Sequence, residues 1–189
     1  MFLETEDKLT IRARVPRGSA LERRTDVADF VMARKDGTYT DGRRPDTVEP
    51  GSLEDDLRRR DFTINAMALD EDGSLIDLFG GRNDLIEGTL RFVGRAEDRI
   101  EEDGLRVIRG LRFMVTKGMT PSLDTFMALK SPESALALGR VSIERIANEL
   151  SRMFQFDTIR SLRVLGEFPV LHDAMFRGQL HLTSSLTRV

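Results

Sequence analysis

The stretch EEDGLRVIRGLRF, residues 101–113, decides how the second half of the chain folds. Its apolar residues recur at helical spacing, and arginines stand at every third position, at Arg106, Arg109 and Arg112. On a wheel of about 100° per residue these arginines form a ridge beside the apolar stripe. The stretch therefore predicts an amphipathic helix with one apolar face and one cationic edge.

Two interpretations of the cationic edge are open. In the first it is a solvated face, with Glu102 four residues and Asp103 three residues before Arg106, and such pairs contribute only ~0.2–0.5 kcal/mol each. In the second it binds a flat anionic ligand, because all three cations are arginine, whose planar group suits paired hydrogen bonds. Gly110, which costs a helix about 1 kcal/mol relative to alanine, would then allow another surface to approach closely.

The second interpretation has a specific chemistry. A carboxylate only accepts hydrogen bonds and a guanidinium only donates them. The pairing edges of cytosine and adenine both offer an amino donor beside a ring-nitrogen acceptor, whereas guanine and uracil present the reverse order. A fixed Asp103 and Arg106 can therefore hold C or A and reject G and U, at ~1–3 kcal/mol per good bidentate contact. The remaining arginines would meet phosphates.

A second constellation is RRRDFTINA, residues 58–66. It is either a charged helix end followed by a buried segment, with Asp61 capping the next turn, or part of a ligand site. In the ligand site Arg60 would contact a phosphate, and Asp61 and Asn65 would bond a ribose or the backbone. Each of these two motifs is weak when it is taken alone.

The first half of the chain is of mixed α/β character. Residues 9–15 alternate polar and apolar side chains as a half-buried strand does, and residues 26–34 predict a second strand. Residues 35–52 are rich in Gly, Pro, Asp and Thr, which predicts a long loop. Loops of that length are usually functional or mobile.

A short helix is predicted at residues 53–60, with Ser52 and Asp55 in the positions of a capping box, and a hairpin at residues 67–77. From residue 79 onward the pattern is helical, so the predicted fold class is α+β. We expect a short, incomplete α/β head at residues 1–80 and an all-α tail at residues 81–189. The predicted helices are 81–88, 96–118, 121–130, 141–156 and 160–176, the last with a break at Pro169.

Composition excludes several kinds of site. The 189 residues carry a net charge of −3 and no cysteine, which excludes disulfides, thiolate metal sites and a cysteine nucleophile. Two histidines with no Cys cluster argue against a zinc site. No secretory signal and no apolar run of membrane-spanning length are visible, so the prediction is a soluble, cytoplasmic protein without a membrane partner.

Taken together and in this order, the motifs resemble the class II tRNA nucleotidyltransferases, the CCA-adding enzymes, and their poly(A) polymerase relatives in the polymerase beta superfamily. The resemblance is dense from residue 26 to residue 150. The segments that carry it are DFVMAR (29–34), DGRRPDTV (41–48), LEDDLRRRDFTINAMA (53–68), IDLFGGRNDL (76–85), RIEEDGLRVIRGLRF (99–113) and VSIERIANEL (141–150).

The resemblance implies a role for each candidate residue. It implies that Arg60 and Asp61 bind the sugar and phosphate side of a nucleotide, with Asn65 beside them, and that the loop at 35–52 takes part in switching from C to A addition. It also implies that Asp29 stands near the catalytic acids, although an ordinary strand aspartate fits equally well. The family template for CTP or ATP falls on Glu102, Asp103 and Arg106, and further nucleotide contacts fall on Arg109 and Arg112.

Two family segments have no counterpart in this sequence: a Gly-Gly-x-Val-Arg-Asp segment that touches the triphosphate, and an Asp-x-Asp strand that holds magnesium. Mg²⁺ is therefore implied as a cofactor, but its family ligands are missing, so we expect the isolated chain not to extend tRNA. A smaller departure is Gly104, where the family often has proline.

Three interpretations follow. In the first, the chain belongs to a nucleotidyltransferase that adds CCA, or A, to the tRNA 3′ end from CTP and ATP, and a separate N-terminal segment or chain supplies the metal ligands. It is alternatively a non-catalytic nucleotide- or RNA-binding remnant, or one half of a split enzyme. The third interpretation, a purely structural helical module, accounts poorly for the order of the motifs.

Overall fold

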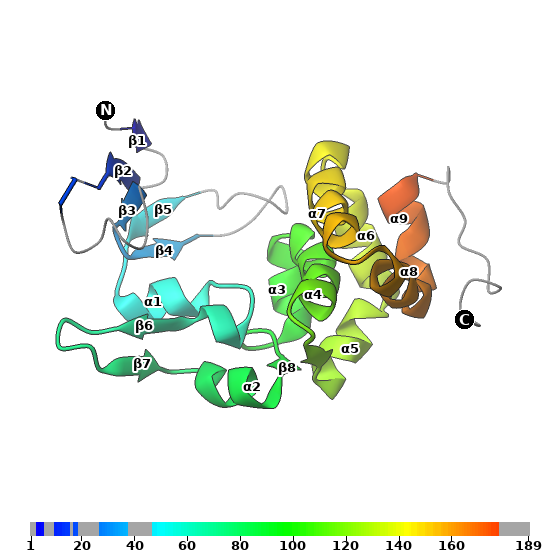
Figure 1. The fold of residues 1–189 in the computed structure, drawn as a ribbon, viewed down its shortest axis with the longest axis horizontal. Coiled ribbons are helices and arrows are strands. Elements are labelled where there is room, and N and C mark those ends of the chain that lie inside the picture. The colour runs from blue at the N-terminus through cyan, green and yellow to red at the C-terminus, as the bar shows by residue number, and fades with distance from the viewer. Residues whose placement is uncertain (1–2, 6–9, 16, 19–26, 38–46, 178–189) are drawn as a thin grey trace. The chain divides into compact units, whose positions relative to one another are not determined.

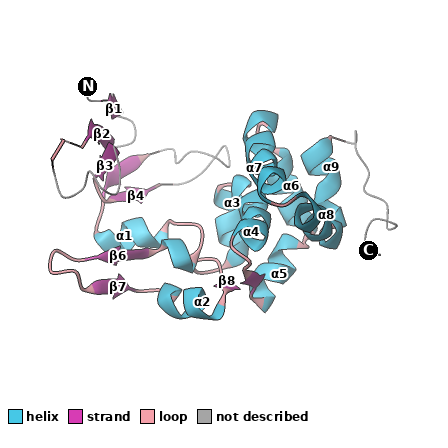
Figure 2. Cartoon of the chain, viewed as in Figure 1, coloured by secondary structure: helices cyan, strands magenta, loops and turns pink. Residues whose placement is uncertain are grey.

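A computed structural model describes residues 3–5, 10–15, 17–18, 27–37 and 47–177 (Figure 1). The described residues divide into two compact units, one ending at Asp56 and the other beginning at Leu57. The fold is α+β as predicted, with short strands and many helices (Figure 2). The division into a head at 1–80 and a helical domain at 81–189 stays a prediction.

The first unit contains an antiparallel sheet of three short strands. β1 (Leu3–Thr5) pairs with β2 (Thr10–Arg14), and β2 pairs with β3 (Val27–Val31). The strands predicted at 9–15 and 26–34 are therefore confirmed. In the β2–β3 register Ile11 stands opposite Phe30, and the two side chains are 43% and 64% exposed.

The segment 35–52 differs in part from the long loop that we expected. β4 (Arg34–Asp36) pairs antiparallel with β5 (Val48–Pro50), so both ends of the segment are short strands. Three-residue strands carry too little alternation for their sequence pattern to reveal them. Residues 38–46, the middle of the proposed switching loop, lie outside the described residues.

The chain then forms α1 (Leu53–Arg58) and a hairpin of β6 (Met67–Leu69) and β7 (Leu75–Asp77), both as predicted. The capping box at the start of α1 is confirmed. The Ser52 hydroxyl accepts a hydrogen bond from the Asp55 amide at 3.1 Å, and the Asp55 carboxylate accepts one from the Ser52 amide at 2.9 Å.

The predicted break at Gly80 is also confirmed. Gly80 has a φ of 74°, a left-handed conformation that glycine adopts without strain, and it precedes α2 (Gly81–Glu87). The Asp77 carboxylate accepts hydrogen bonds from the amides of Gly81 at 2.8 Å and Arg82 at 2.9 Å, which caps this helix. Burial raises the pKa of Asp77, but the amide hydrogen bonds outweigh burial and lower it overall.

Helices make up most of the remaining chain (Figure 1). The predicted helices at 121–130 and 141–156 are confirmed, and the helix at 160–176 breaks at Pro169 as expected. No pattern predicted α6 or the parallel two-residue strands β8 and β9. The elements are β8 (Thr89–Leu90), α3 (Ala96–Glu102), α4 (Leu105–Thr116), β9 (Thr120–Pro121), α5 (Leu123–Leu129), α6 (Pro132–Gly139), α7 (Ile143–Phe156), α8 (Thr158–Glu167), a 3-10 turn (Pro169–Leu171) and α9 (His172–Phe176).

The prediction of one helix over residues 96–118 is wrong. α3 ends at Glu102, Asp103 is extended with φ −148° and ψ 103°, and α4 begins at Leu105. The Asp103 carboxylate accepts a hydrogen bond from the Leu105 amide at 3.0 Å and so caps the new helix. A Cβ at Gly104 would lie 2.1 Å from the Ala137 carbonyl oxygen, so the junction packs backbone against backbone on α6.

The apolar face of α4 forms the centre of the core. Leu105, Val107, Ile108, Leu111 and Val115 are all buried there, as the helical wheel predicted. Burying a side chain of this size contributes about 1.5–3 kcal/mol, so this face alone accounts for much of the packing that holds α4 in place. The ridge arginines are therefore presented from a firmly anchored helix.

Gly110 does not serve the close approach that we expected. A Cβ at Gly110 would lie 3.6 Å from side-chain atoms of Leu129 and Phe62, which is ordinary van der Waals contact. The Phe62 ring itself packs on Phe92 at 4.7 Å and edge-on against Phe113 at 5.4 Å.

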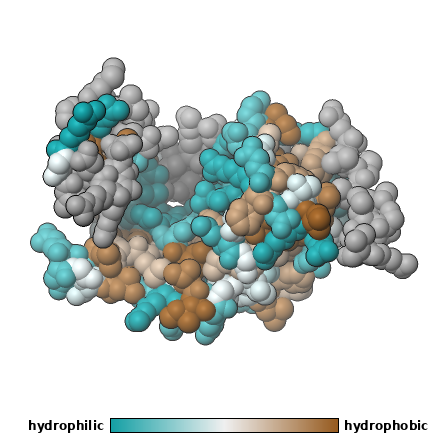
Figure 3. Space-filling model, in the orientation of Figure 1, coloured by the Kyte–Doolittle hydropathy of each residue, from teal (hydrophilic) through white to brown (hydrophobic). Residues whose placement is uncertain are grey.

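The outer face of α2 carries exposed apolar side chains. Leu85 and Ile86 are exposed there, and hydrophobic atoms gather over this helix on the face seen in Figure 3. None of the helices in the described ranges is long and apolar enough to cross a membrane.

Candidate functional site

Each arginine of the α4 ridge is paired with a carboxylate from a different element. Arg106 pairs with Glu102 at the end of α3, Arg109 with Asp61 after α1, and Arg112 with Glu149 on α7. The ridge is therefore not a freely solvated face. It brings together five of the predicted site residues: Asp61, Glu102, Arg106, Arg109 and Arg112.

Arg106 is the most tightly held of the three. Its Nη1 donates to Glu102 at 2.6 Å and to the Arg99 carbonyl at 2.9 Å, and its Nη2 donates to the Arg59 carbonyl at 2.7 Å. Only 11% of its side chain is exposed. Glu102 also binds the Arg99 guanidinium, so this carboxylate joins two cations. The Glu102–Arg106 pair inferred from the sequence is confirmed.

Asp103 has a different partner from the one its spacing suggested. Its carboxylate lies 3.1 Å from Nη2 of Arg145, a residue of α7, and forms no described ion pair with Arg106. The expected Asp103–Arg106 pair is therefore wrong, because Asp103 lies outside α4 in an extended conformation. The two residues remain neighbours along the backbone, where the Arg106 amide donates to the Asp103 carbonyl at 3.0 Å.

The Asp61 carboxylate accepts hydrogen bonds from three residues. Its Oδ1 accepts from the Phe62 amide at 2.8 Å and from Asn65 Nδ2 at 3.0 Å. Its Oδ2 accepts from Nε of Arg109 at 2.8 Å and from Nη2 of the same guanidinium. Burial raises the pKa of Asp61, but the Arg109 charge and the hydrogen bonds outweigh it and lower the pKa below 3.8. Asp61 is therefore an ionised, fully occupied acceptor.

Arg112 closes the far end of the ridge. Its Nε donates to Glu149, and its guanidinium lies 4.4 Å from the centre of the Phe113 ring. Glu149 is buried and also has Arg152 at 3.6 Å. A carboxylate this deeply buried needs a cation beside it, so this pair anchors α4 to α7.

The two remaining predicted residues lie elsewhere. Arg60 is exposed, and its Nη1 donates to the Asn65 carbonyl at 3.3 Å. Asp29 lies on β3, opposite Arg12 in the sheet register, and is exposed. It belongs to the first unit, whereas all the other site residues belong to the second.

Sequence reasoning missed the residues that hold the site from outside the two motifs. Arg145 and Glu149, four residues apart on α7, both reach residues of the stretch 99–113. Their segment, VSIERIANEL, was part of the family resemblance but had no role in it. The Arg–Glu spacing along one helix face was the available signal.

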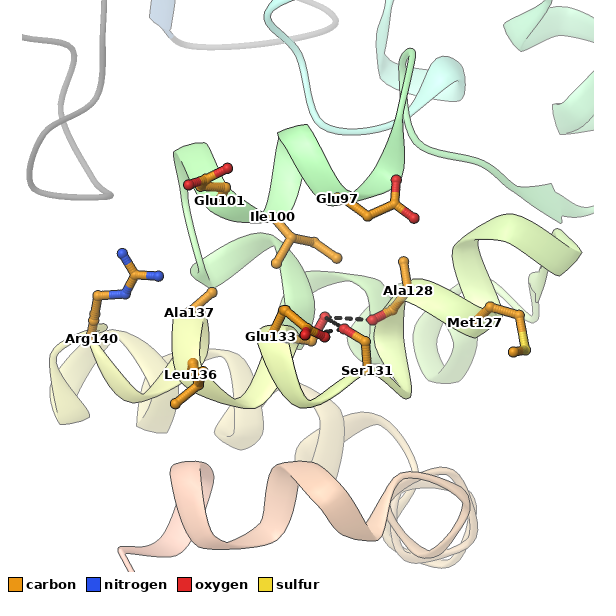
Figure 4. A pocket seen from close by; sticks show the side chains of 11 residues that line it. Glu97, Ile100, Glu101, Met127, Ala128, Ser131, Glu133, Leu136, Ala137 and Arg140 are labelled. Carbon is orange, nitrogen blue, oxygen red and sulfur yellow. Dashed lines mark hydrogen bonds between the residues drawn. The ribbon is translucent and has the colours of Figure 1, made fainter.

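A cavity of about 400 Å³ lies between α3, α5 and α6 (Figure 4). Ile100 and Ala137 contribute to its apolar lining, and Glu97, Glu101 and Glu133 contribute acidic side chains. None of the predicted nucleotide residues lines it. Arg140 is the basic side chain of the lining, and because the three acids outnumber it the cavity repels phosphate and does not match the expected nucleotide site.

Magnesium has no fitting ligand set in the part of the chain that the structure describes. No three acidic or histidine side chains converge there as a metal site requires. Asp70, Glu71 and Asp72 lie together in the β6–β7 turn. The Asp70 carboxylate accepts from the Glu71 amide at 2.7 Å, and the Asp72 carboxylate accepts from the Ser74 amide at 2.8 Å.

The chain is similar to known proteins over much of its length. Residues 2–91 match the family model of the poly(A) polymerase head domain. The CCA-adding enzyme of Bacillus subtilis (strain 168) is 45% identical over 144 residues, which are 72% of this chain and 36% of that enzyme.

Solved structures agree with the sequence match. The Bacillus stearothermophilus CCA-adding enzyme in complex with CTP aligns with a TM-score of 0.74 at 33% identity, over 89% of this chain and 38% of that one. A tRNA nucleotidyltransferase complexed with a primer tRNA and an incoming ATP analog aligns with a TM-score of 0.74 at 28% identity, over 99% and 50% of the two chains. The chain spans about a third of the length of the curated relatives it matches.

Proposed function

The chain belongs to the family of CCA-adding enzymes and poly(A) polymerases, and from this premise we propose that it selects CTP and ATP for addition to a tRNA 3′ end. The whole protein would then be a tRNA nucleotidyltransferase, in which the tRNA 3′-hydroxyl attacks the α-phosphate of the nucleotide and releases pyrophosphate. The relatives solved with CTP, and with a primer tRNA and an ATP analog, support this substrate class.

One observation carries the proposal: Asp103, an acceptor, and Arg106, a donor, are joined through their backbones at the start of α4, and each side chain is held by a third residue. Asp103 is held by Arg145, and Arg106 by Glu102. A base edge with an amino donor beside a ring-nitrogen acceptor can therefore meet both without first breaking a bond between them. Cytosine and adenine offer that edge.

The described contacts of Arg106 leave donors for such a base. A guanidinium has five N–H donors. Three of them are used by Glu102 and by the carbonyls of Arg99 and Arg59. The donors that these three bonds leave are Nε–H and one Nη2–H. Both N–H bonds lie in the plane of the guanidinium, and we propose that a ring nitrogen or a carbonyl of a base accepts from them.

We assign the sugar side of the nucleotide to Asn65 and Arg60. Asp61 accepts four hydrogen bonds, which fills the acceptor sites of a carboxylate. Because Asp61 only accepts, the Asn65 amide must turn its NH₂ group toward it and its oxygen away. Asp61 would thus orient Asn65 so that the amide oxygen can accept from a ribose hydroxyl, while the exposed Arg60 meets a phosphate.

Arg109 and Arg112 would support this site and contribute charge. Arg109 uses its Nε and Nη2 on Asp61, and Arg112 uses its Nε on Glu149. The other guanidinium nitrogens can still donate to phosphate oxygens. Asp29 stays a candidate for a catalytic role.

The proposal is tested by displacing a fluorescent CTP analogue from the 189-residue chain with each of the four ribonucleoside triphosphates. We expect CTP and ATP to compete about tenfold better than GTP and UTP, since one good bidentate contact is worth ~1–3 kcal/mol. Equal competition by all four would reject it. That the isolated chain does not extend tRNA stays a prediction, which incorporation of radiolabelled CTP by the pure chain would contradict.

A further inference from the structure

The helix α7 contacts the stretch that carries the proposed nucleotide residues. VSIERIANEL, residues 141–150, forms the first half of α7. Two of its side chains reach the stretch that carries the nucleotide residues. Arg145 contacts Asp103 at 3.1 Å, and Glu149 contacts Arg112. The helix therefore lies behind the site and holds it at two points.

The contact between Arg145 and Asp103 uses only one of the two terminal nitrogens of the guanidinium. Nη2 of Arg145 reaches both carboxylate oxygens, at 3.1 and 3.5 Å, whereas Nη1 is buried and has no hydrogen-bond partner among the described residues. An unsatisfied buried donor costs about 1–3 kcal/mol. The hydrogen bonds to Asp103 are therefore the described side-chain interactions that the Arg145 guanidinium makes.

The chemistry of base reading offers an explanation. A carboxylate beside a guanidinium forms an ion pair readily, and an Asp103 bound to Arg106 would have to release it before either could meet a base. In the structure the carboxylate is drawn to α7 by Arg145 instead. On the other side Arg106 is held by Glu102 and two backbone carbonyls. The acceptor and the donor are thus kept from satisfying each other.

We propose that Arg145 is a positioning residue that sets base selectivity, by holding the Asp103 carboxylate apart from Arg106 and oriented toward the amino group of cytosine or adenine. This inference rests on the proposed function, since it concerns how the same site chooses its nucleotide. Arg145 touches no nucleotide in this scheme and acts through Asp103 alone.

The decisive variant is Arg145→Met, which keeps much of the length of the side chain and removes its charge and donors. We expect the affinity for CTP and ATP to fall about tenfold, while the affinity for GTP and UTP stays as in the wild type. Arg145→Lys keeps a cation within reach of Asp103 and should retain part of the selectivity. The matched control is Arg152→Met on the same helix, whose side chain is 64% exposed and which should bind all four nucleotides as the wild type does.

A double-mutant cycle separates positioning from a general structural effect. If Arg145 acts through Asp103, then Arg145→Met should cause little further loss of selectivity in an Asp103→Asn background. Additive losses in the cycle would overturn the inference, and so would unchanged selectivity of a folded Arg145→Met protein. Should Arg145→Met fail to fold, the same cycle run with Arg145→Lys decides between the two results.

The binding data also separate this inference from the proposed function. A wild-type chain that binds all four nucleotides equally rejects the proposed function itself. A wild-type chain that prefers CTP and ATP, together with an Arg145→Met variant of the same preference, rejects the role of Arg145 alone.

Discussion

The two ends of the α4 ridge use the same residue types in opposite ways. At the far end Arg109 and Arg112 are joined directly to buried carboxylates, Asp61 and Glu149. At the near end Arg106 and Asp103 are neighbours that do not pair, because each has a partner of its own. Both ends therefore consist of ion pairs, and the difference is that two separate pairs meet at the near end, which is where we expect a base to bind.

We expect this difference to separate stability from recognition along one helix. Breaking a far-end pair should mainly destabilise the fold, and changing the near end should mainly change which nucleotide binds. Each prediction below tests that separation.

The largest effect is expected for Arg109→Met. It leaves the Asp61 carboxylate, only 9% exposed, without its cation, and should lower the free energy of unfolding by roughly 2–4 kcal/mol; the lower part of this range allows for Arg109 being 31% exposed. Urea denaturation measures this loss. Arg95→Met is the control, because Arg95 is 75% exposed and its ion pairs are at the surface. A loss no greater than that of the control would show that the far end is not structural.

Asp103→Asn should change nucleotide selectivity strongly and stability little. Asparagine caps a helix about as well as aspartate, and its amide oxygen can still accept from Arg145 in place of the ion pair, so the free energy of unfolding should fall by only about 1 kcal/mol. The amide places a donor where the base needs an acceptor, so the preference for CTP and ATP should fall by about 10- to 100-fold. A selectivity that survives this change would remove Asp103 from the base-reading role.

Acid should destabilise the fold by protonating Asp61 at the far end of the ridge. Because the folded protein lowers the pKa of Asp61 below 3.8, its contribution is present above that ordinary value and is lost as the pH falls through the lowered pKa. The free energy of unfolding should therefore drop between about pH 5 and about pH 3, and drop less in Asp61→Asn. Asp77, whose pKa is also lowered, contributes equally to both proteins. Identical pH profiles for the two proteins would contradict the assignment.

The smallest effect is expected for Gly110→Ala. The added methyl group would meet Leu129 and Phe62 at ordinary contact distance, and alanine favours a helix over glycine, so stability should rise by about 0.5–1 kcal/mol. Nucleotide selectivity should not change, because the residue lies on the buried face. Destabilisation in a thermal melt would mean that the glycine serves the packing after all.

Local patterns in the sequence predicted the local structure well. The apolar stripe of α4, the capping box of Ser52 and Asp55 and the hairpin at 67–77 depend on residues a few positions apart, and all are confirmed. The break at residues 103–104 was missed because its cause is not local. It depends on α6, whose Ala137 carbonyl fills the space beside Gly104.

The partners of the site residues could not be predicted for the same reason. Asp61 and Arg109 are 48 positions apart, Glu149 and Arg112 are 37 apart, and Arg145 and Asp103 are 42 apart. Spacing rules reach one or two helical turns. The sequence therefore predicts which residues read a base, and only the fold shows which residues contact them.

The central claim, that Asp103 accepts the amino group of the base, is tested most directly with a CTP analogue whose exocyclic amino group is replaced by hydrogen. The dissociation constants of CTP and of this analogue are compared for the 189-residue chain by calorimetry. The analogue should bind about tenfold more weakly than CTP to the wild type, and this penalty should shrink in Asp103→Asn. Equal binding of CTP and the analogue by the wild-type chain would contradict the account.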